Sequence, residues 1–156
     1  MNRSFCVKLS LHAILMTIAA ALIGAAPAAQ AQADAAAAAA NEPNAVVTAS
    51  GLVYRSLKDG SGSSPSATDV VKVHYRGTFP DGKEFDSSIA RGKPAEFPLN
   101  RVIKCWTEGV QLMKIGGKAR LTCPAAIAYG ERGAGGTIPP NATLHFEVEL
   151  LGIAGK

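Results

Sequence analysis

The side chains of this sequence that could do chemistry are mostly aromatic, and few polar groups accompany them. No serine lies in a strand-to-helix elbow, no cysteine pairs with a histidine at a usable spacing, and no glycine-rich turn matches the dinucleotide or P-loop kind. This set favours a binding site, with the single tryptophan as its floor. The candidates are Tyr75, Phe85, Phe97, Trp106, Tyr129 and Phe146, accompanied by Asp86 and Arg91.

The alternative is that these aromatic residues are simply the hydrophobic core, and for Phe97 neither interpretation is favoured. Tyr129 argues for a site, because it lies in a loop among small residues where core packing needs no aromatic ring. His74 and His145 fall on the polar sides of expected strands, which does not favour a metal site. Residues 130–136 are glycine-rich but lead into Ile-Pro-Pro, which is typical of a flexible loop rather than a phosphate cradle. Neither a metal nor a cofactor is expected.

One amphipathic helix is predicted within residues 100–116. Trp106, Val110 and Met113 recur at i, i+4 and i+7, so one face of this helix is apolar. A Gly-Gly pair follows and supplies the stop. A single helix among strands is expected to lie across a sheet and fill its core.

The rest of the region after residue 50 alternates between apolar and polar residues, which is typical of half-buried strands. The clearest alternation covers residues 71–75, 119–123 and 144–150, and a long loop at 124–142 separates the last two. Phe97 belongs to an edge segment, where the neighbouring Pro98 is tolerated. Together, these strand patterns and the single helix predict an α+β domain, in which an antiparallel sheet surrounds one helix.

The N-terminus predicts a secretory signal peptide over residues 1–33, with two basic residues, an apolar stretch at 9–23 and a closing Ala-Gln-Ala. Cleavage after Ala31 or after Ala33 fits equally. A transmembrane anchor is the rival interpretation, but the apolar stretch is short and no charged stop follows it. The mature protein is therefore expected to be exported, periplasmic or secreted, with no membrane attachment after cleavage.

Residues 34–50 are alanine-rich and contain a proline, and we interpret them as a flexible linker. Residues 51–156 then form the one domain for which the chain of 156 residues has room. The formal net charge of +4 includes two basic residues of the leader. The remainder is too small and too evenly spread to indicate nucleic acid or an anionic membrane as partner.

Four linked motifs resemble the FKBP-type peptidyl-prolyl cis-trans isomerases: VHYRGTFPDGKEFDSS (73–88), VIKCWTEG (102–109), AYGERG (128–133) and IPPNATLHFEVELL (138–151). The resemblance covers residues 50–153 and is closest to an exported bacterial single-domain type, related to the macrophage infectivity potentiator branch. It implies a five-to-six-stranded antiparallel sheet wrapped around one short helix, with a pocket between them.

The resemblance also implies roles for single residues. Trp106 matches the floor of the pocket, Ile103 a backbone amide donor and Tyr129 a hydroxyl donor. Arg91 matches a basic residue that pairs with the region of Asp86 and Tyr75. Asp86 either polarises the substrate carbonyl carbon or orients Tyr75 and Arg91, and the second role is favoured because an unpaired carboxylate beside apolar walls is costly. The remaining substrate-binding residues would be Tyr75, Phe85, Arg91, Phe97, Val102, Ile138 and Phe146.

The implied activity is rotation about X-Pro bonds in proline-containing peptides and unfolded exported proteins, by a monomer, with macrolides as candidate inhibitors whose effect the sequence does not decide. The alternatives are a proline-recognising chaperone, or an interaction or virulence-associated module, with incidental catalysis. On this fold Cys105 begins the helix and Cys123 faces inward on the strand beneath it. A disulfide between them is favoured by export, and two buried thiols are the alternative.

Overall fold

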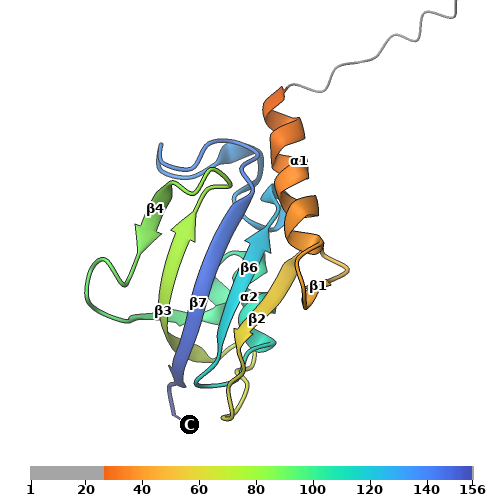
Figure 1. Ribbon diagram of the computed structural model, residues 1–156. Helices are drawn as coiled ribbons and strands as arrows, with labels where there is room; N and C mark the ends of the chain where they lie inside the picture. The colour runs from red at the N-terminus through yellow and green to blue at the C-terminus, as the bar shows by residue number, and fades with distance from the viewer. Residues whose placement is uncertain (1–26, 156) are drawn as a thin grey trace, which may run out of the picture.

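The computed structural model describes residues 27–155, which form a seven-stranded antiparallel sheet with a short helix packed against one face (Figure 1). The α+β class is confirmed. The strands are β1 (Ala45–Val47), β2 (Val53–Lys58), β3 (Val70–Thr78), β4 (Glu84–Ser87), β5 (Ala95–Pro98), β6 (Lys118–Cys123) and β7 (Leu144–Ile153). The helices are α1 (Pro27–Ala40) and α2 (Lys104–Gln111), and 3-10 turns occupy Leu99–Arg101, Ala125–Ile127 and Gly130–Arg132.

Strand β3 organises the sheet, whose order is β1-β2-β6-β7-β3-β4. It pairs with β7 along most of its length. On its other edge it pairs with β5 near its beginning and with β4 near its end. Two short strands therefore share one edge of β3, and this arrangement brings their aromatic residues beside Tyr75.

Helix α2 crosses the inner face of the sheet behind β6 and β7 in the view of Figure 1. Its apolar stripe is buried as predicted, with Trp106 4% exposed, Val110 fully buried and Met113, just beyond its end, 2% exposed. Gly109 allows the close approach, because a Cβ there would lie 2.7 Å from the side chain of Leu121 on β6.

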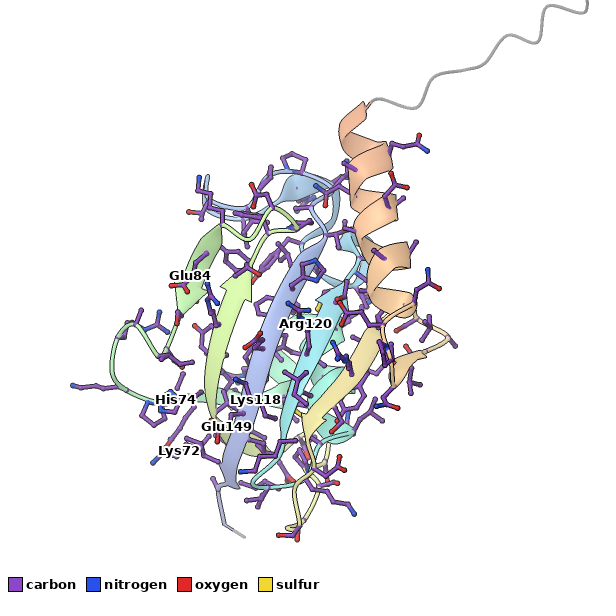
Figure 2. The ribbon with its side chains drawn as sticks, in the orientation of Figure 1. Lys72, His74, Glu84, Lys118, Arg120 and Glu149 are labelled. Carbon is purple, nitrogen blue, oxygen red and sulfur yellow. A yellow bond between two sulfur atoms is a disulfide. The ribbon has the colours of Figure 1, made fainter. Side chains whose placement is uncertain are left out.

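The outer face of the same strands carries the polar residues of the alternating pattern. On β3 the buried Val71, Val73 and Tyr75 alternate with Lys72 and His74, which point away from the helix side. Figure 2 shows this face, where the labelled side chains Lys72, His74, Lys118, Arg120 and Glu149 project from three adjacent strands.

The expectation of a flexible linker over residues 34–50 is corrected, because this segment holds the end of α1 and the whole of β1. An alanine helix is marginal when isolated in water, but α1 packs against β1, β2 and β6. Gln32 accepts a hydrogen bond of 2.6 Å from the Thr143 amide, and Glu42 pairs with Arg55 and Arg120. Strand β1 raises the number of strands to seven, above the five to six expected.

The predicted signal peptide falls largely on residues 1–26, which lie outside the described residues, and it stays a prediction. Residues 27–33 belong to α1. Within the described part of the chain, no helix has the length and apolar character needed to cross a bilayer.

Candidate active site

A cavity of about 460 Å³ lies between α2 and the inner face of the sheet. Nine of the residues singled out from the sequence line it, together with Arg101, which sequence reasoning missed although it directly precedes Val102 and Ile103. The lining residues are Tyr75, Phe85, Asp86, Phe97, Arg101, Val102, Ile103, Trp106, Tyr129 and Phe146.

The Trp106 indole lies at the centre of the aromatic lining. Its ring meets those of Tyr75, Phe97 and Phe146 edge to face, with centroids 5.3, 5.6 and 5.4 Å away. Such T-shaped contacts are favourable because the positive edge of one ring meets the negative face of another. The first turn of α2 thus presents a rigid apolar surface, which the sequence pattern predicted only as buried.

Phe85 and Phe146 continue this wall, with their rings perpendicular and 5.6 Å apart. Gly77 on β3 makes room for both, since a Cβ there would lie 2.6 Å from the Phe85 ring and 3.1 Å from the Phe146 ring. Sequence reasoning missed this position, although a glycine inside a strand pattern is a known signal of close approach.

Asp86 is the only carboxylate on the cavity lining, and both of its oxygens are engaged. The Tyr75 hydroxyl donates to Oδ2 at 2.5 Å, and the Arg91 guanidinium donates to Oδ1. Arg91 Nη2 also donates to the Tyr75 hydroxyl oxygen at 2.8 Å, and the guanidinium lies 5.6 Å from the centre of that ring. The pairing of Arg91 with Asp86 and Tyr75, which the resemblance implied, is present.

These contacts set the protonation states of the group. Burial by itself would raise the pKa of Asp86, but the hydrogen bonds from Tyr75 and Arg91 and the positive charge of Arg91 lower that pKa below its ordinary value. Burial, and then the hydrogen bond to the Asp86 carboxylate, raise the pKa of Tyr75. At neutral pH the network therefore contains a carboxylate, a neutral phenol and a guanidinium.

Ser88, another residue that sequence reasoning passed over, holds the segment carrying Arg91 against β3. It is fully buried, and its Oγ accepts a hydrogen bond of 2.8 Å from the Tyr75 amide. Its own amide donates to the Tyr75 carbonyl at 3.0 Å, and His74 Nδ1 lies 3.1 Å from its Oγ. Tyr75 is thereby fixed through its backbone as well as through its hydroxyl.

Two hydrogen-bond donors lie on the lining without a partner among the described residues. Ile103 is the N-cap of α2, where no side chain caps the helix, and no described residue accepts from its N–H. Tyr129 is 38% exposed, and burial followed by the charge of Asp86 raises the pKa of its phenol, so it stays protonated. Both groups can donate to a carbonyl oxygen placed in the cavity.

Three other predicted positions differ in their placement. Phe97 on β5 lies on the lining and contacts the Tyr75 ring at 5.8 Å, so it serves both core and cavity. Val102 also lies on the lining. Ile138 does not: it is 8% exposed within the core, and its carbonyl accepts a hydrogen bond of 2.9 Å from the Ala134 amide.

The structure contains the disulfide between Cys105 and Cys123, so the alternative of two free thiols is set aside. The two Cα atoms are 5.8 Å apart, and neither cysteine is exposed. Within residues 27–155, no group of three or more histidine, cysteine or acidic side chains could hold a metal ion.

The arrangement can bind a compact apolar group and orient carbonyls beside it. The aromatic rings enclose the apolar volume, while the Ile103 amide and the Tyr129 hydroxyl supply direction. The cavity lining contains no serine or cysteine, and its one carboxylate, on Asp86, is held by Tyr75 and Arg91.

Comparison with protein families gives a match over residues 61–151 to the model described as FKBP-type peptidyl-prolyl cis-trans isomerase. The chain is 60% identical over 106 residues to the FKBP-type peptidyl-prolyl cis-trans isomerase FkpA of Aeromonas hydrophila, which covers 68% of this chain and 39% of that protein. It is 58% identical over 106 residues to the FKBP-type 22 kDa peptidyl-prolyl cis-trans isomerase of Escherichia coli K12, with 68% and 52% covered. The chain thus spans about half, or less, of the length of these relatives.

Solved structures agree with these matches. A peptidyl-prolyl cis-trans isomerase from Pseudomonas syringae pv. tomato is similar with a TM-score of 0.76 and 39% identity, covering 83% of this chain and 98% of that one. FkpA from Escherichia coli is similar with a TM-score of 0.72 and 44% identity, covering 80% of this chain and 61% of that one.

Proposed function

Because the chain belongs to the FKBP-type peptidyl-prolyl cis-trans isomerase family, we propose that it catalyses rotation about X-Pro peptide bonds in the cavity above Trp106. The observation that supports this proposal is an aromatic enclosure with two hydrogen-bond donors, the Ile103 amide and the Tyr129 hydroxyl, that have no partner among the described residues. Such a site suits a reaction in which only a torsion angle changes.

The physical basis is the electronic structure of the amide. Resonance keeps the prolyl bond planar, with a rotation barrier of about 18–20 kcal/mol. The twisted state loses this resonance, and with it much of the carbonyl dipole that water stabilises. A water-poor aromatic cavity therefore disfavours the planar amide more than the twisted one, which lowers the barrier.

In this mechanism Trp106, Phe146 and Phe85 hold the proline ring. The Ile103 N–H and the Tyr129 hydroxyl donate to the carbonyls on either side of it and fix the orientation of the flanking chain. Val102, Phe97 and the stem of Arg101 extend the contact surface for the neighbouring residues of the substrate.

Asp86 acts as an orienting group rather than by polarising the substrate carbonyl. Both of its oxygens already accept hydrogen bonds, from Tyr75 and from Arg91. This pairing offsets the desolvation of a carboxylate beside aromatic walls and leaves Tyr75 fixed as one side of the cavity.

The substrates that we propose are exported proteins with exposed proline segments, in the periplasm or outside the cell. The predicted leader supports this location, and so does a disulfide, which persists in oxidising compartments. A macrolide inhibitor should compete with substrate, because its apolar ring would occupy the cavity that receives proline.

The test is the cis-to-trans relaxation of a proline tetrapeptide, followed through a protease that cleaves only the trans form. We expect the relaxation rate to rise linearly with protein concentration above the thermal rate, and a macrolide to abolish the rise. A rate equal to the thermal rate at micromolar protein, with the disulfide intact, would reject the proposed activity.

A further inference from the structure

The disulfide joins the two backbone segments that carry the donors of the site. Cys105 lies two residues after Ile103 and directly before Trp106. Cys123 is the last residue of β6, and Tyr129 follows it by six residues. The disulfide therefore links the start of α2, which carries Ile103 and Trp106, to the segment that carries Tyr129.

Apart from the disulfide, the first turn of α2 is held by the packing of the Trp106 ring against three aromatic rings and by few polar contacts. A helix of eight residues does not persist by itself, and its N-cap makes no side-chain hydrogen bond. Thr107 Oγ1 donates to the Leu99 carbonyl at 2.6 Å, and the exposed Ser50 hydroxyl donates to Glu108 at 2.5 Å. The close contact of Gly109 with the Leu121 side chain holds the middle of the helix rather than its beginning.

Residues 124–128, a short compact segment, connect Cys123 to Tyr129, so the disulfide also restrains the position of Tyr129. Cys123 pairs with Leu144 at the end of β6. Ile127, four residues further on, is 8% exposed, and its amide donates to the Pro124 carbonyl at 3.1 Å. The Gly130 carbonyl accepts from the Asn141 amide at 2.8 Å, which ties down the far side of Tyr129.

We propose that the Cys105–Cys123 disulfide is a positioning element of the site, which fixes the Ile103 amide and the Trp106 indole relative to the Tyr129 hydroxyl. The inference rests on the proposed isomerase activity. Its consequence is that breaking the bond lowers turnover beyond what any loss of stability causes, because the first turn of α2 then shifts against residues 124–129 while the sheet stays intact.

The experiment compares a Cys105→Ala/Cys123→Ala double variant with wild type and with a control that loses stability elsewhere. Leu150, fully buried on β7 and not on the cavity lining, provides the control as Leu150→Val or Leu150→Ala, whichever matches the double variant in its urea midpoint. All proteins are assayed where circular dichroism shows them folded, with kcat and KM measured separately.

We expect kcat/KM of the double variant to fall about tenfold, mainly through KM, because a misplacement of about 1 Å disrupts carbonyl orientation. The matched Leu150 variant should stay within about twofold of wild type, since it leaves the donors in place. Wild type unfolded, reduced and refolded in reductant should behave like the double variant, which excludes the change in side-chain volume as the cause. Equal losses in the double variant and the control, or full activity of the reduced protein, would overturn the inference.

Amide hydrogen exchange supplies a readout that does not depend on turnover. In the double variant, faster exchange should be confined to residues 103–107 and 124–130, whereas the Leu150 variant should show its change along β7. Unchanged exchange in the first of these segments would also overturn the inference. An inactive oxidised wild type would reject the proposed activity, and the exchange comparison would still decide whether the disulfide positions these segments.

Discussion

Neighbouring residues of β3 and β4 form two polar pairs on opposite faces of one sheet. On the inner face Tyr75 donates to Asp86, and on the outer face Arg76 Nε donates to Glu84 at 2.7 Å. Both carboxylates are partly exposed, with side chains 43% and 37% accessible. The pairs differ in what surrounds them: Tyr75 is 5% exposed and borders the aromatic cavity, while Arg76 faces solvent.

The difference predicts that the surroundings of a polar pair, rather than the pair itself, decide whether its loss changes turnover. An exposed ion pair adds little to the free energy of unfolding, because water screens the two charges and forming the pair orders two flexible side chains. On the inner face, Asp86 and Arg91 fix the Tyr75 side chain, which lines the cavity, so removing the Asp86 carboxylate should lower the rate of turnover. The substitutions below separate the two faces, beginning with the largest expected effect.

The floor of the cavity should be the most sensitive position. Trp106→Leu removes the ring that three aromatic side chains contact edge to face, and we expect kcat/KM to fall about a hundredfold. Leu112→Ala is the control, because Leu112 ends the same helix and is 50% exposed. Steady-state kinetics on the proline tetrapeptide measures both, and a similar loss in the two variants would contradict a special role for the indole.

The two carboxylates provide the direct contrast between the faces. Asp86→Asn weakens the hydrogen bonds from Tyr75 and Arg91, so kcat/KM should fall about tenfold. Glu84→Gln should leave kcat/KM within about twofold of wild type. If both variants lose activity equally, the distinction between the faces fails.

Removing one neutral hydrogen-bond donor should lower kcat/KM less than the Asp86 substitution does. Tyr129→Phe keeps the ring and deletes the hydroxyl, so we expect about a fivefold fall in kcat/KM, the effect of a single neutral hydrogen bond. Because burial raises the pKa of this phenol, the wild-type rate should stay flat from neutral pH up to the ordinary tyrosine range near pH 10. A decline of the wild-type rate near pH 8 would mean that another group controls it.

The outer face should respond to pH through stability and not through turnover. Burial, followed by the charge of Arg120, lowers the pKa of His145, which lies 2.8 Å from the Thr122 hydroxyl. The unfolded chain then binds protons more readily than the folded one, so the free energy of unfolding should decrease as pH falls below about 6.5. His145→Gln should reduce this decrease in urea titrations and leave kcat/KM unchanged.

The sequence predicts the sheet, α2 and the cavity well because local pattern and linked motifs agree in this region. Alternation along β3, β6 and β7 is set by which face is buried, and the apolar period around Trp106 marks α2. Phe97 is the position where pattern alone could not choose between core and site, and in the structure it belongs to both.

The sequence did not predict the parts that depend on tertiary contact. The alanine run of α1 has no amphipathic pattern, and its helix is held by partners distant in the chain, such as Thr143 and strand β6. Gly77 carried a signal, a glycine inside a strand pattern, but the sequence does not show which rings need the space. Ser88 carried none, because its role is a hydrogen bond to the backbone of Tyr75 on another strand. Ile138 matched a motif that implied a contact with the substrate, but its side chain is buried in the hydrophobic core and does not line the cavity.

The most direct test of the central claim uses the single tryptophan as a reporter, because Trp106 lines the cavity. Emission is recorded while a proline-containing peptide is added, with the matched alanine peptide as control. We expect a saturable change with the proline peptide only, and a dissociation constant equal to the constant with which that peptide inhibits turnover. Catalysis that proceeds with no change in Trp106 emission, or equal changes with both peptides, would contradict a proline site at this tryptophan.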